Sequence, residues 1–204
     1  MRLAIDVKQI TGHCNVLVGQ HARRERQRSV TSFVRVTPEF AIGAQISAAD
    51  IAQIREAGFA AIINARPDDE EGSYILSGEG RKIAEDQGLI YAHCPTENHA
   101  IFEPSAINRF ELALAELPKP VLAHCKSGTR AAILWGLVAA RHRPVEDVIS
   151  TLRAAGQDIE FLEDELRDSA KVARGSPLRL KDDALLGLGR SLLLGNSQRD
   201  TGQE

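Results

Sequence analysis

The fold is decided by one twelve-residue stretch, VLAHCKSGTRAA, at residues 121–132. Its first four residues predict a short strand buried in a sheet, and the apolar run from Ala131 predicts a helix. A polar loop that begins at Cys125 and contains one glycine, Gly128, joins the two. Because the free amide groups at the start of a helix point back toward the preceding loop, this stretch predicts an anion-binding loop at the end of a strand.

The same loop has the components of a reactive cysteine site. Converging amide dipoles and the guanidinium of Arg130 favour a thiolate at Cys125, which is the nucleophilic form of the side chain. Gly128 allows a turn that residues with a Cβ resist, and Lys126 adds positive potential. We therefore expect Cys125 and Arg130 to be catalytic. The expected anion-binding loop consists of Lys126, Ser127, Gly128, Thr129 and Arg130.

Strand and helix patterns alternate on both sides of this stretch. The patterns predict strands at 33–36, 39–43, 59–64, 89–93 and 121–124, and helices at 48–57, 77–87, 104–117, 131–140, 144–152 and 161–172. Alternating strands and helices indicate an α/β fold with a mostly parallel central sheet and helices on both of its faces. In such folds ligands bind at the carboxyl ends of the strands, and the Cys125 loop lies at one such end.

The length of 204 residues and the 43% hydrophobic content suit one domain with tails. We expect a weakly ordered basic arm at 1–30, which contains the charge cluster 23–28, and a catalytic domain at 31–174. Residues 175–204 are expected to form a flexible tail, because glycine and proline interrupt its apolar pattern.

The composition narrows the classes of partner. The net charge of -3 and the pI of about 6.1 favour neither nucleic acid nor a membrane surface, and no apolar run approaches the length of a membrane span. Three cysteines make no disulfide framework, and the amino terminus does not resemble a secretory signal, so we expect a cytoplasmic protein. We expect a small anionic substrate, with no nucleic acid, membrane or cofactor; the oligomeric state stays open.

A family resemblance adds to this picture. The segments that carry it are AIGAQISAADIAQIREAGFAAIINARPDDEE (41–71), IYAH (90–93) and PVLAHCKSGTRAAILWGL (120–137). They resemble the beta-lactamase hydrolase-like protein, phosphatase-like domain family. The Cys125 loop is similar to that of the protein tyrosine and dual-specificity phosphatases, whose pattern is His-Cys, five residues, Arg. The resemblance implies a dual-specificity-phosphatase-like topology. Members of the family are described both as phosphatases and as rhodanese-like sulfurtransferases.

Loop length separates the two activities. Four residues lie between Cys125 and Arg130, one fewer than in phosphatases and the number found in rhodanese-like enzymes. A shorter cradle should suit the terminal sulfur of a persulfide better than three phosphoryl oxygens. Ala131 also stands where phosphatases commonly have a hydroxyl, unless Thr129 substitutes. The sequence thus favours a sulfurtransferase with a Cys125 persulfide, with a phosphatase that forms a phosphocysteine as the alternative and a non-catalytic anion-binding regulatory module as a third hypothesis.

A phosphatase also needs a general acid for its leaving group. Glu97 follows the IYAH strand, roughly where dual-specificity phosphatases have an aspartate, and Asp68 lies in the loop after FAAIIN. Either residue can equally be a solvated loop carboxylate. Sulfur transfer from a persulfide needs no dedicated acid.

Two basic residues are expected to support the loop. Arg66 belongs to the segment NARPD (64–68), which matches the family pattern Asn-x-Arg-Pro-Asp. It either binds substrate anions or braces the Cys125 loop, or it pairs with an aspartate and holds the turn. His124 is expected to donate a ring N–H to a loop carbonyl and thereby fix the loop.

Cys94 ends a predicted strand and is either a resolving thiol for Cys125 or a half-buried structural thiol. The nearest approach to a metal-ligand cluster is His93, Cys94 and His99. Zinc sites usually draw on a second pair of ligands elsewhere, so we expect no metal site.

Overall fold

The computed structural model describes residues 33–72 and 74–175. The chain divides into two units, 1–31 and 32–204, and all described residues belong to the second. The arm expected at 1–30 lies outside the described residues. The tail expected at 175–204 also lies outside them, apart from Gly175, which ends the last helix.

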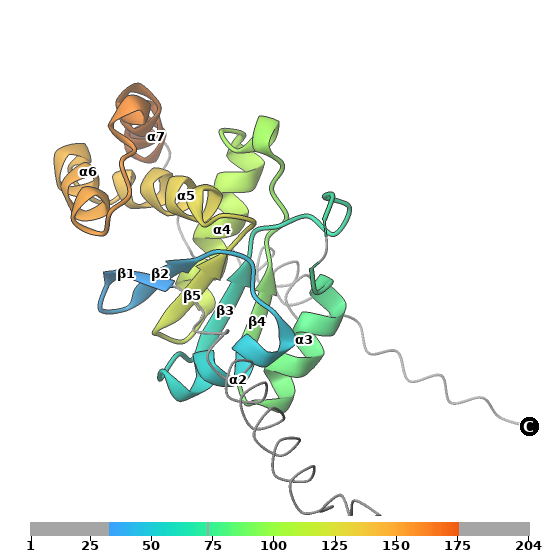
Figure 1. The fold of residues 1–204 in the computed structure, drawn as a ribbon. Helices are drawn as coiled ribbons and strands as arrows, with labels where there is room; N and C mark the ends of the chain where they lie inside the picture. The colour runs from blue at the N-terminus through green and yellow to red at the C-terminus, as the bar shows by residue number, and fades with distance from the viewer. Residues whose placement is uncertain (1–32, 73, 176–204) are drawn as a thin grey trace, which may run out of the picture. The chain divides into compact units, whose positions relative to one another are not determined.

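Five strands form one sheet in the order β1-β2-β5-β3-β4 (Figure 1). Strands β2, β5, β3 and β4 run parallel, and β1 pairs antiparallel with β2. The mostly parallel sheet predicted from the alternation of elements is therefore confirmed. The strands are β1 (Phe33–Thr37), β2 (Phe40–Gly43), β3 (Ala61–Asn64), β4 (Ile90–His93) and β5 (Val121–His124).

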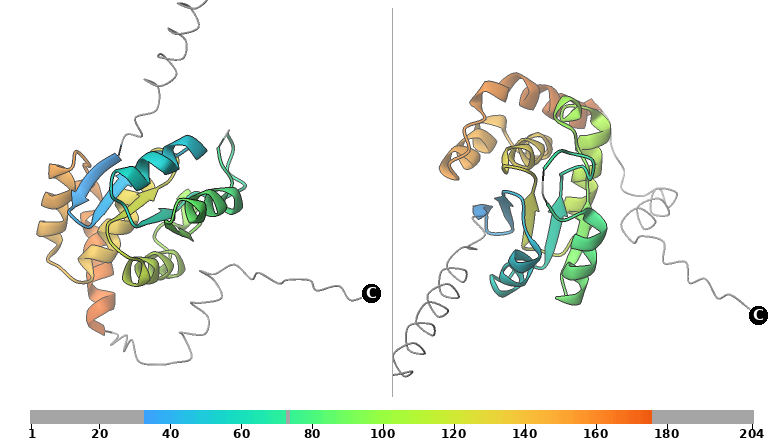
Figure 2. Two further views of the ribbon diagram at one scale, coloured as in Figure 1. Left: turned by 90° about the horizontal axis from the view of Figure 1, so that it is seen from below. Right: turned by 45° about the vertical axis from the view of Figure 1, so that its right-hand side comes forward.

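Helices cover both faces of the sheet (Figures 1 and 2). Alternate residues of each strand point to opposite faces: Ile62 packs into one hydrophobic cluster and Ile63 into the other. The Ile62 face is covered by α2 (Ala48–Glu56) and α3 (Ser77–Asp86). The Ile63 face is covered by α4 (Pro104–Glu116), α5 (Thr129–Ala140), α6 (Val145–Ala154) and α7 (Glu163–Gly175). Two 3-10 turns, η1 (Asn98–Ala100) and η2 (Glu160–Leu162), complete the described elements.

Helix α5 packs closely between the sheet and the outer helices. Trp135 stacks on Phe40 of β2 with ring centroids 5.6 Å apart. Gly136 leaves room for Ile159, because a Cβ there would lie 3.0 Å from its side chain. The helix begins at Thr129, two residues earlier than the apolar pattern predicted, and this places Arg130 in its first turn.

Within the described ranges, no helix combines the length and apolar character needed to cross a membrane.

Candidate active site

Cys125 directly follows the central strand. Strand β5 lies between β2 and β3, and its last residue, His124, is opposite Gly43 of β2 and Asn64 of β3. The loops that leave β2, β3 and β5 therefore meet at one edge of the sheet. Cys125 is buried at this edge, with 1% of its surface exposed.

The turn after Cys125 directs a backbone amide at the sulfur. The N–H of Gly128 donates to Cys125 Sγ over 3.2 Å. Gly128 has a φ of +98°, and a Cβ on it would lie 3.3 Å from the carbonyl oxygen of Gly43. The positive φ and the close approach together explain the glycine. The amide of Gln45 donates to the carbonyl of Lys126 over 3.2 Å and ties the loop to the segment that follows β2.

Three residues of the loop lie at the surface: Lys126, Ser127 and Thr129. The Ser127 hydroxyl lies 3.2 Å from that of Thr129, and it accepts the Thr129 amide over 3.4 Å. The expected loop residues thus come together, with two hydroxyls and one ammonium group on its outer side.

Arg130 is nearly withdrawn from solvent, at 6% exposure. Its Nε donates to Asn98 Oδ1 over 3.1 Å, and its Nη1 donates to the carbonyl of Ala65 over 3.3 Å. Its Nη2 forms an ion pair of 2.9 Å with Glu70. Sequence reasoning missed Glu70 and Asn98, although the acidic run at 68–71 was a signal for Glu70.

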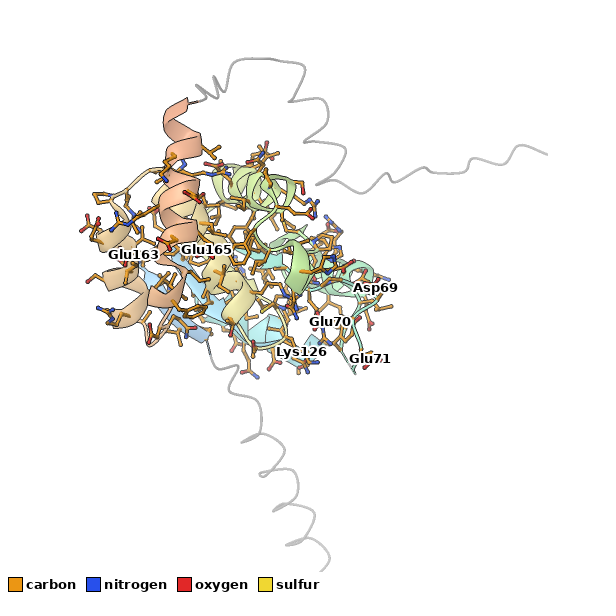
Figure 3. The ribbon with its side chains drawn as sticks, turned by 90° about the horizontal axis from the view of Figure 1, so that it is seen from above. Asp69, Glu70, Glu71, Lys126, Glu163 and Glu165 are labelled. Carbon is orange, nitrogen blue, oxygen red and sulfur yellow. The ribbon has the colours of Figure 1, made fainter. Side chains whose placement is uncertain are left out.

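Figure 3 labels Asp69, Glu70 and Glu71 on the loop after β3, and Lys126 on the loop after β5. Among these three carboxylates, Glu70 is the one with a described ion pair to Arg130.

Arg66 is fully buried and braces the loop that contains Glu70. It donates to Gln45 Oε1 and, over 2.8 Å, to the carbonyl of Glu71, and it lies 3.6 Å from the Tyr74 ring centroid. The carboxylate that faces it is Glu70, at 3.7 Å. These contacts brace the loop after β3, and the carboxylate beside Arg66 is a glutamate rather than the aspartate of the third alternative. Bracing of the Cys125 loop and binding of substrate anions stay predictions.

A pocket of about 500 Å³ is bounded by the loops that follow β3 and β4, and both candidate acids line it. Asp68 accepts the Ser77 amide over 2.8 Å and the Ser77 hydroxyl over 2.5 Å, so both of its oxygens hold the start of α3. Glu97 is more available, because its carboxylate is exposed and contacts only the exposed ring of His99, at 3.2 Å, among described residues. The pocket is lined by Pro67, Asp68, Asp69, His93, Pro95 and Glu97.

His124 is buried behind the nucleophile. Burial lowers its pKa to about 4, and the neighbouring His93 and Arg66 act in the same direction. The Cys125 backbone opposes this shift, but neither ring nitrogen reaches hydrogen-bond geometry with any described residue. The Cys125 backbone lies on the side that the sequence predicts, so donation from the ring to a loop carbonyl stays a prediction, and burial keeps the ring neutral.

The geometry argues against a resolving role for Cys94. Strand β3 separates the strands that precede Cys94 and Cys125, so two strand spacings place them about 10 Å apart. A disulfide requires Cα atoms within about 7 Å. Burial also raises the pKa of Cys94 to about 12. Among described residues, no group of three potential metal ligands comes together, and His93 instead bonds the carbonyl of Arg66 at 2.9 Å.

The family model and the similar curated proteins point to the same family. The sequence model of the "Beta-lactamase hydrolase-like protein, phosphatase-like domain" family matches residues 32–142. The beta-lactamase hydrolase-like protein of Agrobacterium fabrum (strain C58) is 38% identical over 104 residues, which are 51% of this chain and 24% of that protein. Its counterpart in Xylella fastidiosa (strain Temecula1) is 35% identical over the same shares of each chain. The match thus spans about a quarter of these relatives.

Structure comparison finds phosphatase-like proteins. A candidate phosphatase from Neisseria meningitidis Z2491 is 30% identical, with a TM-score of 0.59 over 67% of this chain and 96% of its own. The kinase-associated phosphatase shares the fold, with a TM-score of 0.53 and 15% identity over 71% of this chain and 98% of its own. The dual-specificity-phosphatase-like topology is therefore confirmed.

Proposed function

Because the chain belongs to the beta-lactamase hydrolase-like protein, phosphatase-like domain family, we propose that it is a cysteine-dependent hydrolase of phosphate monoesters. The observation that carries the proposal is the buried Cys125 sulfur, which accepts the Gly128 amide in a loop that leads into Arg130. The comparisons support the phosphatase alternative better than the sulfur transfer that loop length favoured. The substrate class is a small phosphate ester.

The reaction is a double displacement at phosphorus. Cys125 Sγ attacks the phosphorus atom, the bond to the ester oxygen breaks, and a phosphocysteine forms. Water then attacks phosphorus, the S–P bond breaks, and inorganic phosphate and the thiolate are released. The Gly128 amide bonds the sulfur, and the Arg130 guanidinium is the donor that would stabilise the charge on the phosphoryl oxygens.

The leaving oxygen needs a proton, and Glu97 is the better donor of the two candidates. Its carboxyl is exposed on the pocket, whereas Asp68 uses both oxygens on Ser77. We expect Glu97→Gln to lower kcat for an alkyl phosphate about a hundredfold, and to have less effect on an aryl phosphate with a good leaving group. Asp68→Asn serves as the matched carboxylate-to-amide control. A larger kcat loss in Asp68→Asn than in Glu97→Gln would reverse the assignment.

Sulfur transfer is the second candidate, and one observation favours it: only four residues separate Cys125 from Arg130. A sulfur donor would leave a persulfide on Cys125, and an acceptor thiolate or cyanide would remove its outer sulfur. This route uses the same loop and needs neither Glu97 nor Asp68.

A paired assay on the purified full chain tests the proposal. We expect turnover of p-nitrophenyl phosphate that disappears in Cys125→Ser, and no thiocyanate formation from thiosulfate and cyanide. The opposite result, with a one-sulfur mass increase on Cys125, would assign the chain as a sulfurtransferase. Oxyanion binding without either turnover would instead support the regulatory module.

A further inference from the structure

One carboxylate oxygen faces two buried guanidinium groups at the edge of the Cys125 loop. Glu70 Oε2 lies 2.9 Å from Arg130 Nη2 and 3.7 Å from Arg66 Nε. The first distance is a charged hydrogen bond, and the second is too long for one. The side chains of Arg66 and Arg130 are 2% and 6% exposed, so the two cations share a single carboxylate in a poorly solvated place.

Arg66 has a free N–H donor, at Nε, that could bind that carboxylate. Its Nε is buried and has no hydrogen-bond acceptor among the described residues, although Nη1 and Nη2 are bound to Gln45 and Glu71. A buried donor of this kind is costly to leave unsatisfied. A shift of Glu70 by less than about 1 Å would bring its oxygen into hydrogen-bond range of Arg66 Nε.

Arg130, by contrast, has few free N–H donors for a substrate. Each of its three nitrogens already has an acceptor in Asn98, Ala65 or Glu70, which leaves two of its five N–H groups. Arginine binds tetrahedral oxyanions best through two parallel N–H groups. Of the three acceptors, Glu70 is the one with a second cation to move to, so an incoming oxyanion can displace it most easily.

We propose that Glu70 is a positioning residue with two partners. It pairs with Arg130 as the structure shows, and it moves to Arg66 Nε when an oxyanion takes its place on Arg130. Glu70 therefore competes with substrate and product, weakening oxyanion binding and aiding phosphate release. The inference rests on the proposed function only in treating the Cys125 loop as an oxyanion site.

Tungstate binding to the full chain, measured by isothermal titration calorimetry, tests the competition. Glu70→Gln keeps an oxygen acceptor for Arg130 but removes the competing charge, so its Kd should fall about tenfold. Glu71→Gln is the matched control, because this neighbouring side chain is exposed and the substitution removes the same charge; its Kd should change by less than about twofold. An equal or weaker affinity in Glu70→Gln than in Glu71→Gln would overturn the proposal, as would a wild-type chain that does not bind tungstate.

The movement has its own readout in the side-chain ¹⁵N–¹H resonance of Arg66 Nε. Saturation with tungstate should shift this resonance downfield in the wild-type chain, because Nε gains a carboxylate acceptor, and should leave it in place in Glu70→Gln. An unmoved resonance in tungstate-saturated wild-type protein would refute the second position. These measurements separate this inference from the proposed catalysis. If tungstate binds as expected but no phosphate ester is hydrolysed, only the phosphatase proposal is refuted. If the ester is hydrolysed but the tungstate Kd is unchanged in Glu70→Gln, only this inference is refuted.

Discussion

His124 shows how a single residue links the chemistry of the site to stability. Its imidazole is buried directly before the nucleophile, where burial holds its pKa near 4. The ring is therefore neutral in the folded chain at neutral pH. Burial of this neutral ring makes folding stability depend on pH.

We predict that folding stability decreases from pH 6.5 to pH 4 because of His124. Its folded-state pKa lies below the ordinary value of 6.5, so in this interval the unfolded chain binds a proton that the folded chain does not. Above pH 6.5 the buried ring costs no stability, and by pH 4 the free energy of unfolding has fallen by about 3 kcal/mol. Urea unfolding at a series of pH values measures it.

The control for this prediction is another histidine. His124→Gln should flatten the dependence between pH 4 and 6.5, whereas His99→Gln, at an exposed position, should retain it. An unchanged slope in His124→Gln would show that other groups cause the loss.

At the scale of elements, the unit that matters is β5, the four-residue turn and α5. The strand brings Cys125 to the sheet edge, and the helix starts early enough to include Arg130 in its first turn. Gly128 joins the two with a positive φ and a close approach to β2. The conformation of this one turn therefore decides whether the sulfur meets an amide.

We predict that Gly128→Ala disturbs function more than stability. A positive φ costs an alanine about 1 kcal/mol, and Gly88→Ala should show the same cost because Gly88 has a φ of +73° with open space around it. At Gly128 the new Cβ would also press on the Gly43 carbonyl and shift the turn. Turnover should then fall roughly tenfold or more in Gly128→Ala and stay at the wild-type level in Gly88→Ala. Equal turnover in both variants would contradict the prediction.

At the scale of the whole molecule, the helices on the Ile63 face are joined by a buried arginine. Arg141 follows α5 and contacts Glu111 of α4 at 2.5 Å and Ser169 of α7 at 3.3 Å. Its side chain is 4% exposed, so its charge depends on that carboxylate. These contacts connect α4 and α7 to the end of α5, the helix that follows the Cys125 loop.

We predict that Glu111→Gln lowers the free energy of unfolding by about 2 kcal/mol, since it leaves Arg141 buried without a counter-charge. Glu163→Gln is the matched control. Glu163, which is labelled in Figure 3, lies on α7 and forms an exposed ion pair with Arg167. That exposed pair should contribute less than about 1 kcal/mol. Denaturant unfolding of both variants compares the two, and equal losses would show that burial of Arg141 adds nothing.

Local patterns were enough to predict most elements of the fold. Strand β5 was predicted with its observed bounds, and α3 was predicted to within one residue of its observed end. The helix start at Thr129 was missed, because a polar first turn in a loop-like segment has no apolar period. The predicted strand at 59–64 begins two residues later in the structure. Such ends depend on hydrogen bonds to neighbouring strands, which a local pattern does not contain.

By itself the sequence determined the α/β class, the position of the cysteine loop at a strand end, and the need for glycine in its turn. These follow from side-chain periodicity and backbone sterics, which act over a few neighbouring residues. Only the tertiary structure decided that Glu70 and Asn98 hold Arg130, that Asp68 serves Ser77, and that β3 separates Cys94 from Cys125. Those contacts join segments far apart along the chain, and only the order of strands in the sheet determines which loops meet at its edge.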